Sequence, residues 1–235
     1  MLVHTKTHIG LVRASNQDAL LTMAGVIGVA DGMGGHKGGE TASRVAVEVV
    51  QNALQGRTPD ERALKTAFEA ANRRIFDMGK RDVKLSGMGT TLTLVWEGPH
   101  EMWIGHVGDS RAYLYRNGEL LCQTEDHSMV AELLRNHLIT AEIAAEHPYR
   151  NIITRALGID PMVQPDVIKT AKQAGDLWLV CSDGLHSMLP DDQIAEVLGA
   201  LKGENAADKL LELAIEHGGQ DNISFALGAV TEVEA

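Results

Sequence analysis

The sequence predicts a fold of the α+β class, in which strands and helices form separate packed layers. Strand-like runs follow one another in pairs or short series, and segments with helical periodicity also come in pairs. This order differs from the regular alternation of strand and helix that builds parallel α/β sheets. No linker, low-complexity tract or tandem repeat divides the 235 residues. We therefore expect a single domain over residues 1–235.

Seven strands are predicted from short runs that are β-branched or alternate in polarity and that Gly, Asp or Asn bounds. They cover residues 20–24, 26–30, 90–96, 102–107, 111–116, 177–182 and 223–230. Short runs bounded in this way are typical of strands rather than of helices.

Four helices are predicted from apolar residues at three- and four-residue spacing. The second begins at "TPDE" (58–61), a capping box with proline at the first helical position. The predicted helices cover residues 42–54, a segment from the capping box to Ile75, a segment from about Pro190, and 207–215. Shorter helical patches at 129–135 and 141–145 lie in a mixed segment, 127–160.

Composition indicates a globular cytoplasmic protein. Hydrophobic residues make up 44% of the chain, the usual share for a globular fold. The longest apolar runs, such as 177–180, are too short to span a membrane, and the first ten residues lack the layout of a secretory signal. Cys122 and Cys181 lie in apolar contexts and are predicted to be reduced core thiols. We expect no membrane partner.

The charge balance disfavours a nucleic-acid partner. With 32 acidic and 21 basic residues, the formal net charge is −11, whereas phosphate backbones require a basic surface. An acidic balance is compatible with a cation site, although most of it belongs to ordinary solvated surface.

A glycine-rich loop, "VADGMGGHKGGE" (29–40), separates a predicted strand from a predicted helix. It does not match a P-loop, because Lys37 is followed by Gly38 instead of Ser or Thr. It does not match the dinucleotide fingerprint either, since Lys37 stands where the third glycine belongs. Its glycines are therefore expected to admit another kind of ligand close to the backbone.

Five aspartates stand at the ends or starts of predicted strands. Asp31 and Asp183 end two strands of similar build, and Asp109, Asp221 and Asp18 flank three others. Clustered carboxylates repel one another unless a cation holds them together, so their convergence would imply a metal. Oxygen ligands without sulfur favour Mg²⁺ or Mn²⁺. The alternative is that each aspartate belongs to a separate turn, and spacing alone leaves both interpretations open.

Several polar residues beside these aspartates are predicted to be structural. His106 is expected to be a hydrogen-bonded core histidine, and Thr90 and Thr91 to support a strand start. Asn222 is expected to orient Asp221 and its turn. His127 precedes Ser128, but adjacency in sequence does not make a catalytic triad.

Eight short motifs in chain order resemble the bacterial single-domain form of the metal-dependent protein phosphatase 2C family. They extend from residue 13 to residue 224, in the order and approximate spacing of that family, and together they are specific. They are "RASNQD" (13–18), "VADGMGGHKGGE" (29–40), "SGMGTT" (86–91), "HVGDSRAYL" (106–114), "TEDHS" (124–128), "ITRALG" (153–158), "CSDGL" (181–185) and "DNIS" (221–224).

The resemblance implies a four-layer α-β-β-α sandwich, with two antiparallel sheets and helix pairs on the outer faces. It implies two Mn²⁺ or Mg²⁺ ions at one end, admitted together with a phosphate by the glycines of the loop. Asp31 would bridge both ions and the Gly32 carbonyl would bind one of them. Asp183 and Asp221 would complete the shell of the other, and Asp18 would hold metal-bound water at the edge.

Further roles also follow from the resemblance. Asp109, together with Asp183, would hold a third, weaker ion. Arg13 would bind the substrate phosphate through its planar guanidinium. Met33 stands where animal members carry histidine, so the general acid is expected to be His36 or a metal-bound water. The segment 127–160 corresponds to the variable flap of the family.

The activity that the resemblance implies is hydrolysis of phosphoserine and phosphothreonine by in-line attack of a metal-bound hydroxide. The expected partners are phosphorylated proteins, targets of a bacterial eukaryotic-like Ser/Thr kinase, with the kinase itself a further candidate. The chain is expected to be a monomer. Two other classes stay open: a non-catalytic phosphoprotein-binding member, and a two-metal hydrolase of nucleotides or nucleic acid.

Overall fold

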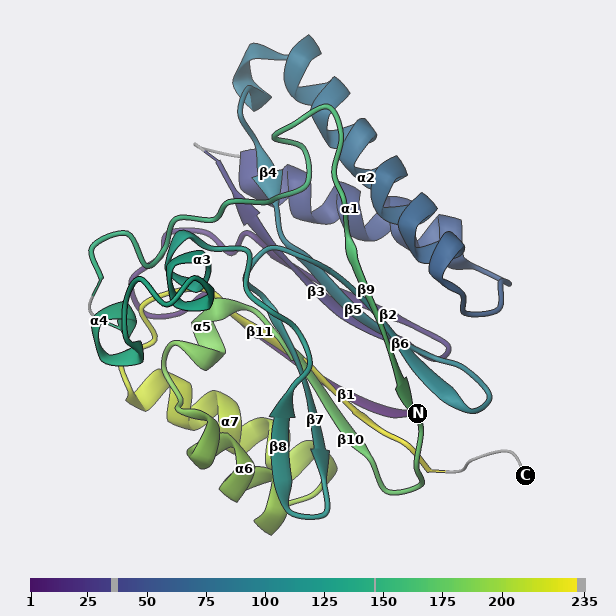
Figure 1. Ribbon diagram of the computed structural model, residues 1–235, viewed down its shortest axis with the longest axis vertical. Helices are drawn as coiled ribbons and strands as arrows, with labels where there is room; N and C mark the ends of the chain where they lie inside the picture. The colour runs from purple at the N-terminus through teal and green to yellow at the C-terminus, as the bar shows by residue number, and fades with distance from the viewer. Residues whose placement is uncertain (35–37, 146, 232–235) are drawn as a thin grey trace.

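The structure is a computed structural model, and it describes residues 1–34, 38–145 and 147–231. Two antiparallel sheets lie face to face, and a pair of helices covers the outer face of each (Figure 1). This arrangement confirms the α+β class and the four-layer sandwich that the resemblance implied.

One sheet has five strands and the other has six, and neighbouring strands run antiparallel in both. In spatial order the first sheet contains β1 (Leu2–His8), β11 (Ile223–Ala229), β10 (Leu177–Cys181), β7 (Arg111–Arg116) and β8 (Glu119–Cys122). The second contains β2 (Asp18–Met23), β3 (Val26–Met33), β5 (Leu92–Glu97), β6 (Glu101–Val107) and β9 (Asp166–Ala171), and β4 (Gly89–Thr90) pairs with β3.

Two long helices cover each sheet. The pair α1 (Gly38–Leu54) and α2 (Glu61–Arg81) packs on the second sheet, and the pair α6 (Asp191–Ala200) and α7 (Gly203–Glu216) packs on the first. The short elements are η1 (Val83–Leu85), α3 (Met129–Arg135), α4 (Ala141–Ala145) and α5 (Asp183–His186). Among the described residues, no helix is both long and apolar enough to cross a membrane.

Along the central strands, side chains alternate between the helix layer and the space between the two sheets. In β3, Val26 and Ala30 pack toward the helices, whereas Ile27 and Val29 pack between the sheets. Because side chains alternate along a strand, Asp31 continues the series that faces the opposite sheet. The register of β3 thus points this carboxylate toward the space where the two sheets end.

Three strands are absent from the sequence prediction, namely β1, β8 and β9. Each is an edge strand of its sheet, and none of their residues is fully buried. An edge strand packs less of its surface than a central one, so its apolar pattern is weak. The segment 127–160 contains α3 and α4, as the short helical patches predict.

Two smaller predictions are wrong. Helix α2 begins at Glu61, because the cap is Asp60, whose side chain accepts the Ala63 N–H, and not Thr58 at the start of the predicted box. Cys122 is exposed rather than in the core, since it ends the edge strand β8, whereas Cys181 is buried as expected. Both thiols are free.

Candidate metal centre

The fold brings the five aspartates from both sheets to one end of the sandwich. Asp18 pairs with Asp31 across β2 and β3, and Asp109 lies in the turn between β6 and β7. From the other sheet, Asp183 begins α5 directly after β10, and Asp221 lies just before β11. The convergence that spacing left open is therefore present in the structure.

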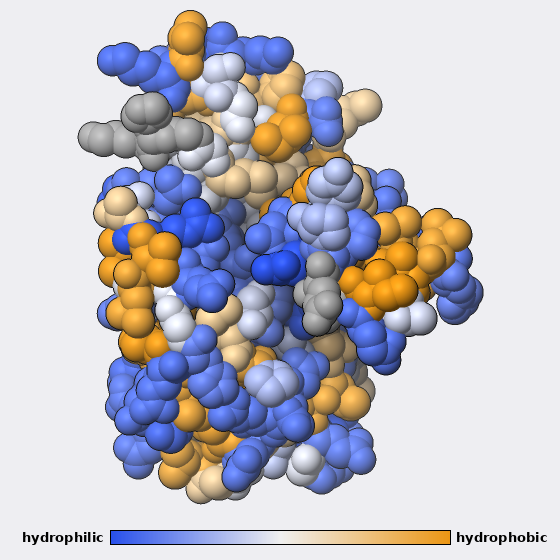
Figure 2. Space-filling model, turned by 90° about the vertical axis from the view of Figure 1, so that its left-hand side faces the viewer, coloured by the Kyte–Doolittle hydropathy of each residue, from blue (hydrophilic) through white to orange (hydrophobic). Residues whose placement is uncertain are grey.

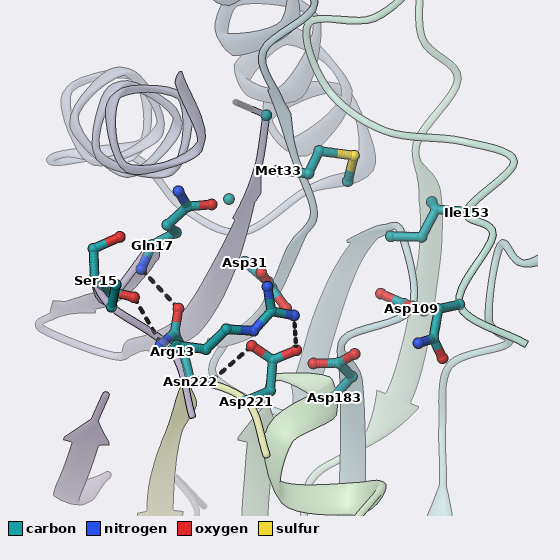
Figure 3. Close-up of a pocket in the computed structure, with 14 residues that line it drawn as sticks. Arg13, Ser15, Gln17, Asp31, Met33, Asp109, Ile153, Asp183, Asp221 and Asn222 are labelled. Atoms are coloured by element: carbon teal, nitrogen blue, oxygen red, sulfur yellow. Dashed lines mark hydrogen bonds and ion pairs between the residues drawn. The ribbon is translucent and has the colours of Figure 1, made fainter. Parts of the chain in front are cut away.

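Four of these five aspartates line a cavity of about 380 Å³. Asp31, Asp109, Asp183 and Asp221 line it together with Arg13, and their side chains point toward one another (Figure 3). Its lining also includes Gly32, Met33, Asn151 and Ile153. Figure 2 shows this face of the molecule, where hydrophilic residues gather around a central hollow.

The carboxylates perturb one another because they are crowded and buried. Burial raises the pKa of Asp18 to about 7, and the charges of Asp183 and Asp221 add to the effect. Burial and the Asp183 charge raise the pKa of Asp109 to about 8. The pKa of Asp31 is well above its usual range, first through burial and then through the other four carboxylates. Without a cation, this arrangement disfavours the ionised forms.

Three carboxylate oxygens at this site have no hydrogen-bond partner among the described residues. They are the buried Oδ1 atoms of Asp18, Asp109 and Asp183. Leaving such oxygens unpaired is costly, and oxygen donors of this kind suit hard divalent cations such as Mn²⁺ and Mg²⁺. The residues present therefore fit the ions that the resemblance implied.

No group of three His, Cys, Asp or Glu side chains within the described ranges forms a ready-made shell for one ion. Three such side chains are not a requirement for every divalent cation, because Mg²⁺ usually keeps several waters and takes only one or two carboxylates. Backbone carbonyls add further donors. An ion bound here would therefore need waters or carbonyl oxygens besides the carboxylates to complete its shell.

Hydroxyl groups hold the cluster in place. The Asp31 N–H donates to Thr91 Oγ1 at 2.9 Å, and Thr90 Oγ1 donates to the Asp31 carbonyl at 2.8 Å. These contacts confirm the structural role predicted for both threonines. The Ser182 hydroxyl donates to Asp18 Oδ2 at 2.9 Å. Sequence reasoning missed Ser182, although it directly precedes Asp183 in the quoted motif.

Asn222 fastens the loop that carries Arg13, as its predicted orienting role requires. Its N–H donates to Asp221 Oδ1 at 2.8 Å, and its side chain donates to the carbonyls of Ile9 and Ser15. Arg13 Nη2 donates to Asp221 Oδ2 at 2.5 Å (Figure 3). The guanidinium thus lies in the cavity, beside a carboxylate.

Four described glycines of the loop have no room for a side chain, and two of them, Gly32 and Gly34, line the cavity. That they admit ions and a phosphate close to the backbone stays a prediction. A Cβ on Gly32 would lie 2.1 Å from the Gly39 carbonyl oxygen, and one on Gly39 would lie 2.3 Å from Gln17 Oε1. A Cβ on Gly34 or Gly38 would meet Met88. The absence of side chains at these glycines also allows the start of α1 to pack tightly against β3 and its neighbours.

The structure tests the prediction for one of two histidines, His106, and not the one for His36. His36 lies outside the described residues. His106 is fully buried, with Nδ1 2.8 Å from Thr93 Oγ1 and Nε2 3.0 Å from the Glu125 carbonyl. Its prediction as a hydrogen-bonded core histidine is confirmed.

Known bacterial proteins are similar to this chain in sequence. The chain is 37% identical over 227 residues to the serine/threonine protein phosphatase PstP of Mycobacterium tuberculosis, an alignment that covers 96% of this chain and 44% of PstP. It therefore spans less than half the length of that relative. It is also 35% identical over 246 residues to the protein phosphatase PhpP of Streptococcus pneumoniae, with full coverage of both chains.

Solved structures share the fold. The crystal structure of the Mycobacterium tuberculosis serine/threonine phosphatase PstP/Ppp matches with a TM-score of 0.92 and 35% identity over 99% of this chain and 100% of that one. A structure of the PstP catalytic domain in complex with two manganese ions matches with a TM-score of 0.90 and 34% identity, over 98% of each chain.

The family model of protein phosphatase 2C matches residues 9–214, a range that contains four of the five clustered aspartates and ends before Asp221. This match agrees with the order of the motifs, the four-layer sandwich and the carboxylates gathered at its end. The chain belongs to the protein phosphatase 2C family.

Proposed function

We propose that this chain is a Mn²⁺- or Mg²⁺-dependent phosphatase that hydrolyses phosphoserine and phosphothreonine in proteins. The observation that carries the proposal is the set of three buried, unpartnered carboxylate oxygens, on Asp18, Asp109 and Asp183. Family membership and the similarity to a phosphatase structure with two manganese ions support it.

The proposal assigns two ions to the cluster. Asp31 would bridge them, the Gly32 carbonyl would bind one, and Asp183 and Asp221 would bind the other, with Asp18 at the edge. Asp109 would hold a third ion together with Asp183. When bound, such ions neutralise charge on phosphoryl oxygens and make water acidic enough to act as a nucleophile near neutral pH.

Arg13 would position the phosphate. Its side chain is 56% exposed and uses one Nη on Asp221, so its remaining N–H donors are available to an anion that enters the cavity. A guanidinium can bind two phosphate oxygens at once. This contact would fix the direction from which the phosphorus is attacked and offset charge in the acidic cavity.

The serine or threonine alkoxide that leaves requires a proton. His36 as the donor stays a prediction, with water as the alternative. We further propose that residues 1–235 act as one catalytic domain, with 127–160 as its flap. A Ser/Thr kinase and its targets as partners, the monomeric state and a cytoplasmic location stay predictions as well.

The test is phosphate release from a phosphothreonine peptide by the purified chain with Mn²⁺, Mg²⁺ or EDTA, beside Asp31→Asn and Asp183→Asn. We expect metal-dependent release that EDTA and either substitution abolish. ATP and single-stranded DNA serve as competing substrates. Faster hydrolysis of these would support a nucleotide or nucleic-acid hydrolase, and a folded protein without any hydrolysis would support a phosphoprotein-binding module.

A further inference from the structure

A buried histidine outside the metal centre joins three parts of the chain. His127 is 2% exposed and lies at the start of the segment 127–160. Its N–H donates to the Gly108 carbonyl at 2.7 Å, and its own carbonyl accepts the Thr154 N–H at 2.8 Å. The main chain of His127 therefore ties both ends of this segment to the turn between β6 and β7.

Both nitrogens of the His127 ring have a partner. The Gly108 N–H donates to Nδ1 at 3.0 Å, so Nδ1 carries no proton and Nε2 does. Nε2 lies 3.1 Å from Asp166 Oδ2 and donates to it. The other oxygen of Asp166 accepts Arg155 Nη1 at 2.6 Å. Burial lowers the pKa of His127, which favours this neutral tautomer.

Gly108, which directly precedes Asp109, has both of its backbone polar groups bonded to His127: its carbonyl to the His127 N–H and its N–H to the ring. Its φ is +113°, and a Cβ there would lie 2.5 Å from Thr91 Cβ, so only glycine fits at this position of the turn. Asp109 lines the acidic cavity and has an unpartnered, buried Oδ1. The direction of that carboxylate depends on the Gly108 peptide, and the Gly108 peptide depends on His127.

We propose that Asp166, His127 and Gly108 form a positioning relay that sets the affinity of Asp109 for a divalent cation. Asp166 orients the ring, and the ring holds the Gly108 peptide. Thr154 and Arg155 connect the end of the segment 127–160 to the same relay. This inference rests on the proposed function, because that function assigns a cation to Asp109.

Two substitutions of His127 each keep one of the two hydrogen bonds of the ring and remove the other. Asparagine places an oxygen near Nδ1, where it can accept the Gly108 N–H, but it is too short to reach Asp166. Glutamine places an NH₂ near Nε2, where it can donate to Asp166, but it leaves the Gly108 N–H without an acceptor. The matched control is His106→Gln, since the fully buried His106 ring lies 4.6 Å from the His127 ring and has no bond to Gly108.

The measurement is Mn²⁺ binding to the purified chain, followed by the electron paramagnetic resonance of free Mn²⁺, with thermal unfolding and peptide hydrolysis in parallel. We expect His127→Gln to weaken one class of Mn²⁺ site about tenfold, as loss of an outer partner of a metal ligand commonly does. The affected class should be the one that Asp109→Asn removes. His127→Asn should bind Mn²⁺ almost as well as the unsubstituted chain, and His106→Gln should lower Tm without changing Mn²⁺ binding.

Unchanged Mn²⁺ binding in a folded His127→Gln variant would overturn the relay, as would equal weakening by the Asn and Gln variants. If His127→Gln does not fold, Asp166→Ala takes its place, because Asp166 is 41% exposed and its loss frees the ring. Normal Mn²⁺ binding by that variant would also overturn the relay. An unsubstituted chain that binds no Mn²⁺ and releases no phosphate would instead refute the proposed function, and the relay with it.

Discussion

Arg13 has two competing partners at the scale of the single residue. Its guanidinium pairs with Asp221, and that contact together with the charges of Asp183 and Asp31 raises its pKa, although burial opposes the shift. A cation that binds the same carboxylates competes with Arg13 for them, whereas a phosphate needs the arginine. Removal of Arg13 should therefore act in opposite directions on the metal and on the substrate.

We predict that Arg13→Ala lowers kcat/KM for a phosphothreonine peptide by about tenfold to a hundredfold, the loss expected when a hydrogen bond to a charged group is removed. Mn²⁺ binding should stay the same or become tighter, because a competing cation has left Asp221. The kcat/KM and the Mn²⁺ affinity of Arg13→Lys should lie between those of Arg13→Ala and the unsubstituted chain, since lysine keeps the charge but not the planar guanidinium. Steady-state kinetics and Mn²⁺ titration measure both effects. Weaker Mn²⁺ binding in Arg13→Ala would show that the arginine supports the metal site instead.

At the scale of elements, α2 is connected to the metal centre through a short loop. The buried Asn72 of α2 accepts the Gly158 N–H at 2.7 Å and donates to the Asp160 carbonyl at 3.0 Å. Leu157 of the same loop exchanges two backbone hydrogen bonds with Thr90, whose hydroxyl holds the Asp31 carbonyl. The helix layer thus helps to fix the strand end that carries Asp31.

We predict that Asn72→Ala lowers the free energy of unfolding by about 1–3 kcal/mol, the cost of leaving a buried backbone donor unpaired. Urea denaturation followed by circular dichroism measures the change. Glu69→Ala, at an exposed position of the same helix, is the control and should stay within about 0.5 kcal/mol of the unsubstituted chain. Equal stability of Asn72→Ala and the control would mean that this loop does not depend on Asn72.

Across the whole molecule, the sequence predicted the central strands, the edge strand β2 and the long helices, and it missed the edge strands β1, β8 and β9. The residues 26–30 and 178–181 are buried on both faces of their strands, so their apolar patterns are strong. Convergence of the aspartates depends on strand pairing, such as Asp18 opposite Asp31, and local spacing does not report pairing between distant segments. The hydrogen bonds of the His127 ring to Gly108 and Asp166 could not be predicted from the sequence for the same reason.

Stability of the whole molecule should depend on pH through His106. Burial is the main cause that lowers the pKa of His106 to about 4, and the neighbouring His127 lowers it further, while Asp126 and Asp166 act in the opposite direction. An unfolded histidine titrates near 6.5. Between these values the unfolded chain binds the extra proton, so folding free energy is lost as the pH falls from about 6.5 toward 4.

The acidic cluster complicates a simple pH profile, because its raised pKa values change stability in the opposite direction in the same range. Comparison with His106→Gln removes this common contribution. We predict that the variant is less stable at pH 7 and that its deficit shrinks by up to about 1.4 kcal/mol per pH unit between pH 6 and 4.5. Urea denaturation of both proteins across this range, in EDTA, measures the difference. A deficit that stays constant with pH would mean that His106 titrates alike in the folded and unfolded chains, and that its burial does not hold it neutral.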